Sequence, residues 1–425
     1  MGKKALSLFL ILLILSSSVT GCYDATEIDD EVYAISVGVD RGVSNKVRLT
    51  VEFPLYAGGS SESGSSSGTG GGSAQEKSTT HTIEAPSILE AVNMYNMATS
   101  RKVSLMHAKW YIFSEEFARE DIGSYIAGLE RFRETRSTTA IIVTRGSAEN
   151  FIRENKSLIG QSISKSAELL VAKSGNTGYF PQVRFIDFYR SLFSPSRSPI
   201  TMYGGVNKFE NLNSTTASSL SGERQGHLPG ELPRASKAGR ELSGMAVFDG
   251  GRMIGSLDNL ETSFYLIVVG KYKGGRMSIP DKNSPGDVII VGLNNSRNPK
   301  ITACFKNGEP AVDALITLDA EIYGIQSRFD YEALSRQGEL ESMIKEYLLD
   351  GINRTIKKTQ ELNADIFGFG ESMAGNFFTI TEWENYNWLS HYKESSIQVS
   401  LEVNVRRMGL IYRSAPIFNT AGKED

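Results

Sequence analysis

VDALITLDAEI, residues 312–322, and IQVSLEVNV, residues 397–405, both alternate apolar side chains with mostly polar ones. Successive side chains of a β-strand point to opposite faces, so each stretch predicts a strand with one buried face. A sheet built from such strands needs a covering layer on its apolar side.

The sequence between these two stretches supplies that layer. No proline occurs from residue 331 to residue 362, and aliphatic residues recur there at every fourth position, at Leu340, Ile344, Leu348, Ile352 and Ile356. This spacing predicts a long amphipathic helix. Burial of such side chains stabilises a fold by roughly 1.5–3 kcal/mol each before entropy is counted. We therefore expect a C-terminal α+β domain, residues 241–412, with a mostly antiparallel sheet backed by this helix.

Residues 22–210 are predicted to form an N-terminal α/β region with room for two subdomains. Strand-like segments at residues 31–40 and 46–56 flank a turn sequence and predict a hairpin. From Pro86 onward, helical and extended patterns alternate. We expect the fold class to be α+β and multi-domain, with mixed or antiparallel sheets that are each covered by helices.

Two changes of composition interrupt this order. Residues 58–73 consist of glycine and serine apart from one glutamate and one threonine, so they have nothing to bury. They predict a flexible Gly/Ser insertion over residues 57–77, between two strands of one domain. Residues 211–240 are rich in Ser, Gly and Arg and predict a linker or a long loop, which we place at the domain boundary. Residues 413–425 are expected to form a tail.

The overall composition excludes several classes of protein. Apolar residues make up 40% and charged residues 22% of the 425 positions, which excludes wholesale disorder, a multi-span membrane protein and a coiled coil. The formal net charge is −4, so no basic excess exists to neutralise a nucleic acid backbone, and we expect no nucleic acid partner. Two cysteines are too few for a disulfide framework or a cysteine-rich zinc site.

The first residues have the pattern of a bacterial export signal. Lys3 and Lys4 precede an almost unbroken apolar run, residues 5–15, and Val19-Thr20-Gly21-Cys22 resembles the lipobox of lipoproteins. This pattern predicts a lipoprotein signal peptide, residues 1–21, followed by acylation of Cys22. The alternative is a soluble secreted protein in which Cys22 is incidental.

Acylation is the expected means by which the protein attaches to a membrane. Cleavage after residue 21 removes two lysines, which leaves 43 basic against 49 acidic side chains and a formal charge of −6. An acidic body does not favour anionic lipid, so attachment to the bilayer is expected to come from two or more acyl chains on Cys22. We expect Cys304 to be a spare thiol with no disulfide partner.

The remaining motifs predict no catalytic residue, no cofactor and no metal site. The histidines His81, His107, His227 and His391 are scattered and lack the i, i+4 spacing of a helical metal site. Three S-x-x-K matches begin at Ser162, Ser342 and Ser390, but neither K-T-G nor S-D-N accompanies them. No phosphate-binding P-loop occurs. We therefore expect a protein that is not an enzyme.

A glycine-rich string, Asp365-Ile366-Phe367-Gly368-Phe369-Gly370, follows the long helix. It predicts a turn that is packed onto the core through Phe367 and Phe369. As a phosphate cradle it is weak, because no basic residue follows it and Glu371 would repel an anion.

Several short strings occur in a distinctive order from residue 22 to residue 409. They are Cys22-Tyr23-Asp24, Val37-Gly38-Val39-Asp40, Lys109-Trp110-Tyr111-Ile112-Phe113, Gly244-Met245-Ala246-Val247-Phe248, Met253-Ile254-Gly255-Ser256-Leu257, the Asp365 to Gly370 string and the segment from Val403 to Gly409. In this order they resemble the Ger(x)C family of spore germination lipoproteins, the C subunits of nutrient germinant receptors. The chain departs from the family at Tyr23, where tryptophan is frequent, and at the Gly/Ser insertion.

The resemblance implies a mixed α+β fold and a non-catalytic subunit. It implies a lipid anchor, such as palmitate, on Cys22 and a location on the outer face of the spore inner membrane. It also implies two membrane-embedded partners, the A and B subunits, with which this chain would assemble or couple the receptor so that nutrients trigger germination. Beyond Cys22, no site residue carries over from the family.

Two other functions fit part of the sequence. A solute-binding lipoprotein of an ABC importer has a similar length, anchor and acidic body, but it predicts two parallel-sheet lobes made from repeated βα units. A cell-envelope acyl enzyme of the S-x-x-K type ranks behind it.

Overall fold

The computed structural model of the chain describes residues 2, 5–7, 9, 27–55, 77–155, 162–208, 226–236, 239–327, 329–409, 417–420 and 422–424. Cys22 lies outside these residues. So do most of the predicted signal peptide, nearly all of the Gly/Ser insertion and much of the predicted linker.

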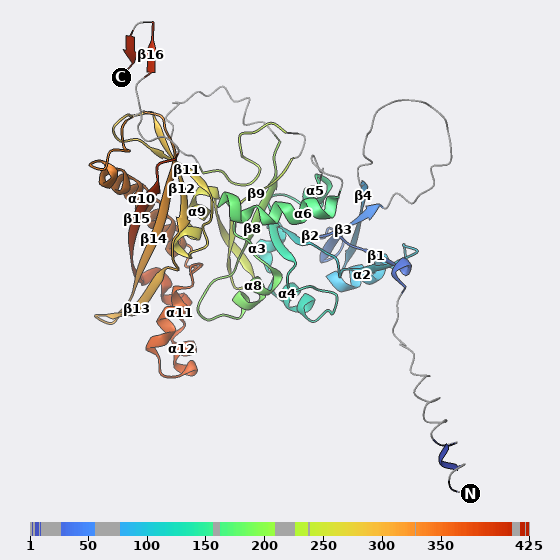
Figure 1. The fold of residues 1–425 in the computed structure, drawn as a ribbon. Coiled ribbons are helices and arrows are strands. Elements are labelled where there is room, and N and C mark those ends of the chain that lie inside the picture. Colours follow the sequence, from blue (N-terminus) through green and yellow to red (C-terminus); the bar gives the residue numbers. More distant parts are fainter. Residues whose placement is uncertain are drawn as a thin grey trace.

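A large mixed sheet of eight strands forms the centre of the molecule (Figure 1). Its order is β10-β9-β8-β7-β6-β2-β3-β4. The four middle strands pair in parallel: β2 (Ser36–Arg41), β6 (Trp110–Ser114), β7 (Ala140–Thr144) and β8 (Ile200–Val206). An antiparallel pair adds to each side: β3 (Val47–Leu55) with β4 (Lys77–Ala85), and β9 (Arg240–Asp249) with β10 (Arg252–Leu257).

Helices cover both faces of the sheet, and apolar residues predominate in its middle strands. Every residue of β6 and β7 is buried, as is usual for parallel strands that have no solvent face. Tyr111 and Phe113 join a core with the helices of one face: α2 (Ile88–Tyr95), α3 (Glu115–Glu120), α4 (Gly123–Glu130) and α8 (Phe185–Leu192). Trp110 and Ile112 join a core on the other face with α5 (Ala148–Arg153) and α6 (Ile163–Ala172).

Smaller elements complete this half. They are the 3-10 helix η1 (Ile28–Asp30), the short helix α7 (Ser174–Thr177), and the parallel pair β1 (Glu31–Tyr33) and β5 (Lys102–Ser104). The predicted hairpin is present as β2 and β3. The Gly/Ser insertion falls between β3 and β4, which are antiparallel neighbours.

The region that we expected to link two domains joins neighbouring strands of one sheet. β8 and β9 are antiparallel neighbours, so the predicted linker or long loop lies between two adjacent strands of one sheet. The first two strands after residue 239, β9 and β10, complete the sheet of the N-terminal region. The C-terminal sheet starts only at β11.

The C-terminal sheet has the predicted cover. Its strands are β11 (Arg276–Pro280), β12 (Val288–Asn295), β13 (Lys300–Lys306), β14 (Glu309–Ile325) and β15 (Ser396–Arg407). The predicted long helix is α10 (Gln337–Glu361), and all five of its predicted aliphatic positions lie in the core. The pairing of β14 with β15 is parallel, because α10 and the segments after it return the chain to the starting end of β14. The other pairings are antiparallel.

The chain between α10 and β15 forms short helices at one end of this sheet (Figure 1). They are α11 (Phe369–Met373), η3 (Ala374–Asn376), α12 (Ile380–Tyr386), α13 (Trp388–His391) and η4 (Tyr392–Glu394). Beyond β15, the described residues of the predicted tail region form a small hairpin, β16 (Ile417–Asn419) with β17 (Gly422–Glu424).

Helix α9 (Asn259–Val268) lies between the two sheets (Figure 1). It follows β10 directly and starts with a capping box, in which Asp258 accepts the Glu261 amide and Glu261 accepts the Asp258 amide. Phe264 to Val268 are all buried. Gly351 of α10 faces the Phe264 ring, where a Cβ would lie 2.1 Å from a ring atom. Glycine at this position therefore allows α9 and α10 to pack closely.

We predict that Ile352→Ala lowers the free energy of unfolding by about 2–5 kcal/mol, because it leaves a cavity under α10 where Ile352 is fully buried. Ile352→Asp should prevent the C-terminal sheet from folding. The control is Lys345→Ala on the exposed side of the same helix, which should change the stability by less than about 0.5 kcal/mol. Urea unfolding followed by circular dichroism measures both, and equal effects of the two alanine variants would contradict the packing.

Candidate functional site

A cavity of about 760 Å³ lies where the two halves of the molecule meet. One wall comes from α8 and the loop 194–198 of the N-terminal half. Other walls come from α9, the loop 270–273 after it, and residues 366–371 beyond α10. The volume is within the range of about 300–1,000 Å³ that is usual for small-molecule sites.

Positive charge dominates the lining. Five basic side chains and two acidic ones surround the cavity, a formal excess of three positive charges: Arg184, Arg190, Arg197, Lys271 and Lys273 against Asp187 and Glu371. Arg184 Nε lies 2.8 Å from an Asp187 oxygen, and Arg197 Nη2 lies 2.9 Å from Glu371. Within the described part of the chain, Arg190 and Lys273 have neither an ion pair nor a side-chain hydrogen bond.

The charges of the lining act on Asp187. Partial burial raises the pKa of this carboxyl group, but hydrogen bonds from the side chain and amide of Arg184 and the charge of Lys271 together hold the pKa below its ordinary value. Asp187 is therefore ionised at neutral pH and partly neutralises the positive charges of Arg184 and Lys271. The charges of Arg190 and Lys273 are not neutralised in this way.

Tyr265 of α9 contributes its hydroxyl group to the wall. The residue is 5% exposed and its ring packs against Phe367 at 5.7 Å. Burial raises the pKa of Tyr265 to about 12, although the nearby charge of Arg197 acts in the opposite direction. The hydroxyl group stays protonated and has no hydrogen-bond partner among the residues that the structure describes.

The Asp365 turn supports the cavity from the C-terminal side. The Asp365 carboxylate accepts hydrogen bonds from the amides of Gly368 and Gly370, both at 2.9 Å, and from Trp388 Nε1 at 2.8 Å. Burial raises the pKa of Asp365, and these three donors oppose the rise. The Asp365 carbonyl accepts the Ser198 amide at 2.7 Å, which ties the turn to the N-terminal half.

The predicted packing of this turn is confirmed. Phe367 and Phe369 are both buried, and their rings stack at 5.1 Å. Gly368 has a φ of 77°, and a Cβ there would collide with the Arg197 guanidinium group. Glu371, which we expected to repel an anion, is paired with that same arginine.

We predict that Asp365→Asn destabilises the fold by about 1–3 kcal/mol, because the new amide group would direct its own N–H donors at the buried donors around it. Glu371→Gln, on the same turn, is the matched control and should cost about 1 kcal/mol or less, since its ion pair is partly exposed. Urea unfolding compares the two, and an Asp365→Asn variant as stable as its control would refute the role of this carboxylate.

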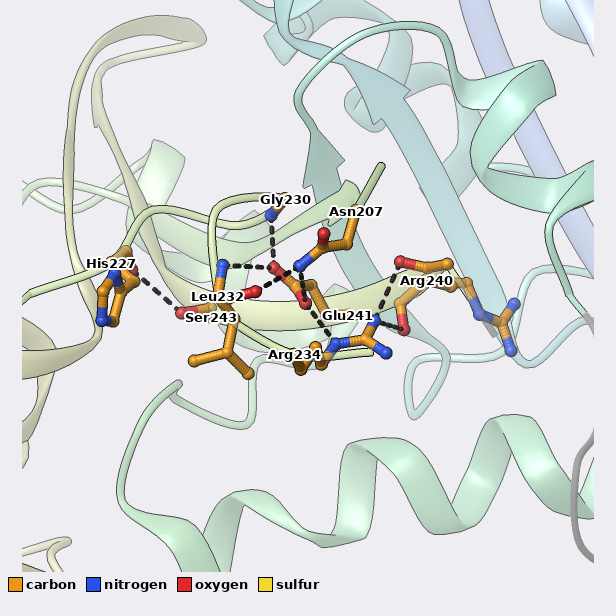
Figure 2. A network of polar contacts seen from close by, with 9 residues as sticks. Asn207, His227, Gly230, Leu232, Arg234, Arg240, Glu241 and Ser243 are labelled. Carbon is orange, nitrogen blue, oxygen red and sulfur yellow. Dashed lines mark hydrogen bonds and ion pairs between the residues drawn. The ribbon is translucent and has the colours of Figure 1, made fainter. Parts of the chain in front are cut away.

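A second polar cluster fixes the end of the β8–β9 loop, as Figure 2 shows. Glu241 of β9 is 7% exposed and accepts hydrogen bonds from the amides of Gly230 and Leu232, from Arg234 Nε at 2.8 Å and from Asn207 Nδ2 at 3.1 Å. Arg234 also donates to the carbonyls of Gly239 and Arg240. One carboxylate thereby holds residues 230–234 against the sheet.

Glu241→Ala should release this loop. We predict faster hydrogen exchange at the amides of Gly230 and Leu232, which lose their acceptor. Glu231→Ala is the control, because Glu231 lies in the same loop and pairs with Arg145 at the surface. Exchange measured by mass spectrometry should separate the two variants, and unchanged protection in Glu241→Ala would show that the network does not hold the loop.

A buried cluster around Arg240 lies next to this network. Its guanidinium group is 4.3 Å from the centre of the Trp110 ring and donates to Asn155. Asn155 donates in turn to Glu52, which also accepts Ser36 Oγ at 2.7 Å. Burial lowers the pKa of Arg240 to about 10, although the charge of Glu52 raises it. These contacts connect β9 and β3 with Ser36 of β2 and with Asn155, which follows α5.

The structure does not bring the candidate site residues of the sequence together. Cys22, the predicted lipidation site, lies outside the described residues. The four histidines lie in separate segments of the chain, and the described residues contain no group of three or more His, Cys, Asp or Glu that could hold a metal ion. Cys304 is a free, partly exposed thiol on β13. Among the helices that the structure describes, none is long and apolar enough to cross a bilayer.

The three S-x-x-K serines have local roles in helices. Ser162 Oγ accepts the Lys165 amide at the start of α6, and the Lys165 ammonium group pairs with Glu168. Ser342 Oγ donates to the carbonyl of Gly338, and Ser390 Oγ donates to that of Asn387. No lysine ammonium group of these motifs contacts its serine hydroxyl in this part of the chain.

Sequence reasoning missed the cavity itself. Its basic residues lie between residues 184 and 273, at no regular spacing, and they come from several elements. A local pattern could have pointed only to Lys271 and Lys273, two residues apart after a helix.

Comparison with known proteins covers nearly the whole chain. A family model described as "Spore germination protein N-terminal domain" matches residues 24–205, and one described as "Spore germination B3/GerAC like, C-terminal" matches residues 243–409. YfkR of Bacillus subtilis (strain 168) is 21% identical over 413 residues, which cover 97% of this chain and 99% of YfkR. Spore germination protein KC of the same organism is 22% identical over 421 residues, which cover 96% of this chain and 97% of that protein.

A solved structure has the same fold. The crystal structure of the GerBC protein matches with a TM-score of 0.52 and 14% identity, over 87% of this chain and 96% of that one.

Proposed function

This chain belongs to the Ger(x)C family of spore germination proteins, and from that membership we propose that it is a non-catalytic subunit of a nutrient germinant receptor. In this role it helps assemble or couple the receptor, so that nutrients trigger spore germination. Its partners are the two membrane-embedded A and B subunits. The observation that carries the proposal is the match to both family models, in chain order, from residue 24 to residue 409.

The proposal includes a lipid anchor on Cys22. The lipobox-like string ends at Cys22, and the described body begins at Glu27, five residues later. Five extended residues span at most about 18 Å, so an acylated Cys22 would hold η1 and β1 close to the bilayer. The location that follows is the outer face of the spore inner membrane. The proposal keeps residues 22–210 and 241–412 as the two domains of the mature chain, with the difference that β9 and β10 complete the large sheet of the first.

The joint between the two sheets supports a role in coupling. Helix α9 packs against β9 of the large sheet and against α10 and β14 of the C-terminal unit. The Ser198 amide donates to the Asp365 carbonyl across the same junction. A partner bound to one half would therefore act on a body whose two halves share a continuous core. The importer alternative requires two parallel-sheet lobes, and the C-terminal sheet has only one parallel pairing among the residues described.

Cys22→Ala tests the proposed anchor. We expect the variant to move from the membrane fraction to the soluble fraction, because it loses the acyl chains that hold it. In a strain that lacks other receptors, its spores should germinate more slowly with nutrient, as followed by the fall in optical density. Cys304→Ala is the matched control, since it removes the other cysteine, a partly exposed thiol on β13.

Two outcomes would count against this proposal. Retention of Cys22→Ala in the membrane fraction would reject the lipid anchor. Spores of a deletion strain without redundant receptors that respond normally to every nutrient would reject the role in germination.

A further inference from the structure

We propose that the cavity between α8, α9 and the Asp365 turn binds a small multivalent oxyanion, a molecule that carries carboxylate or phosphate groups. This inference goes beyond the proposed receptor role and does not depend on it. Charge, a buried donor without a partner on Arg197 and the construction of the cavity support it independently.

The charge of the cavity opposes the charge of the chain. The full chain has a formal charge of −4, whereas the lining has an excess of three positive charges. Arg190 and Lys273 are exposed to solvent and have no anionic partner among the described residues, and the charge of Lys271 acts on Asp187 together with that of Arg184. A hollow lined mainly by one sign of charge concentrates counter-ions from solution, which here are anions. An excess of three favours a multivalent anion over a monovalent one.

The polar groups of the wall favour an acceptor. Tyr265 is more than nine-tenths buried, lines the cavity and has an O–H group without an acceptor in the described part of the chain. Arg197 Nε is buried without a hydrogen-bond partner there. Buried donors are almost always paired in native proteins, so this donor indicates a missing acceptor. Oxyanion oxygens are acceptors only, which suits both groups.

The stabilisation of helix ends by cations explains only part of this arrangement. Lys271 and Lys273 follow the C-terminal end of α9, where cations stabilise a helix. The same effect covers Arg190, which lies in the last turn of α8. It does not account for the buried Arg197 Nε or for the Tyr265 hydroxyl group.

The cavity is built so that a ligand would contact both halves of the protein. Arg190 and Arg197 come from the N-terminal half, whereas Tyr265, Lys271 and Lys273 come from α9 and the loop after it. A second hollow of about 250 Å³ shares Arg197, Tyr265, Lys271 and Glu371 with the first, so the Arg197–Glu371 ion pair stands between the two spaces. An oxyanion in the larger space would compete with Glu371 for Arg197.

The experiment uses the full chain purified in detergent and three probes at matched ionic strength: citrate, inorganic phosphate and acetate. We expect citrate, phosphate or both to give saturable heat in isothermal titration and to raise the unfolding midpoint, because a ligand that binds only the folded state stabilises it. Acetate should do neither. Citrate alone would assign carboxylate chemistry, and phosphate alone would assign phosphate chemistry.

Variants place the binding in this cavity. Arg190→Ala combined with Lys273→Ala should weaken the affinity about tenfold or more, because it removes the two unpaired cations. Tyr265→Phe should weaken it several-fold without any change of charge. The control combines Lys46→Ala with Lys300→Ala, which removes two exposed lysines outside the cavity and should leave the affinity unchanged. All these variants should keep the circular dichroism spectrum of the parent.

The proposal is overturned if neither citrate nor phosphate binds saturably at matched ionic strength. It is also overturned if the cavity double variant binds as tightly as the control double variant. Neither result would bear on membership of the receptor, which membrane fractionation and germination kinetics measure separately.

Discussion

The burial of α9 between two sheets is the constraint on which the rest of this structure depends. A helix that is apolar on nearly every side cannot be covered by one sheet, so β9 and β10 pack on one side of it and α10 and β14 on the other. Gly351 permits the close approach of α10, and the capping box at Asp258 sets the direction of the helix as the chain leaves β10. The two sheets therefore form one body around α9.

The cavity is a consequence of this junction. Its lining comes from elements that meet beside α9, and the Asp365 turn is held there by its own buried carboxylate and by the Ser198 amide. Because Glu371 of that turn pairs with Arg197 of the N-terminal half, a charged contact crosses the junction at the edge of the cavity. A ligand or a partner that changes this contact would act on both halves.

Regular elements could be predicted where local pattern and tertiary burial agree. The alternation in β14 and β15 and the four-residue spacing in α10 reflect one-sided burial, which is written into the order of side chains. The chemistry of the candidate site could not be predicted this way, because Arg190 and Lys273 look like ordinary exposed cations in their own segments. Only their convergence on one hollow makes them informative.

The sequence by itself determined the α+β class, the amphipathic cover of the C-terminal sheet, the packing of Phe367 and Phe369, and the resemblance to the Ger(x)C family. Each depends on residues close together in the chain, whose spacing controls which side faces a core. The tertiary structure alone decided that β9 and β10 join the large sheet, that β15 runs parallel to β14, and that basic residues meet around Tyr265. These features depend on which segments pack against each other across the chain, and no local spacing records that choice.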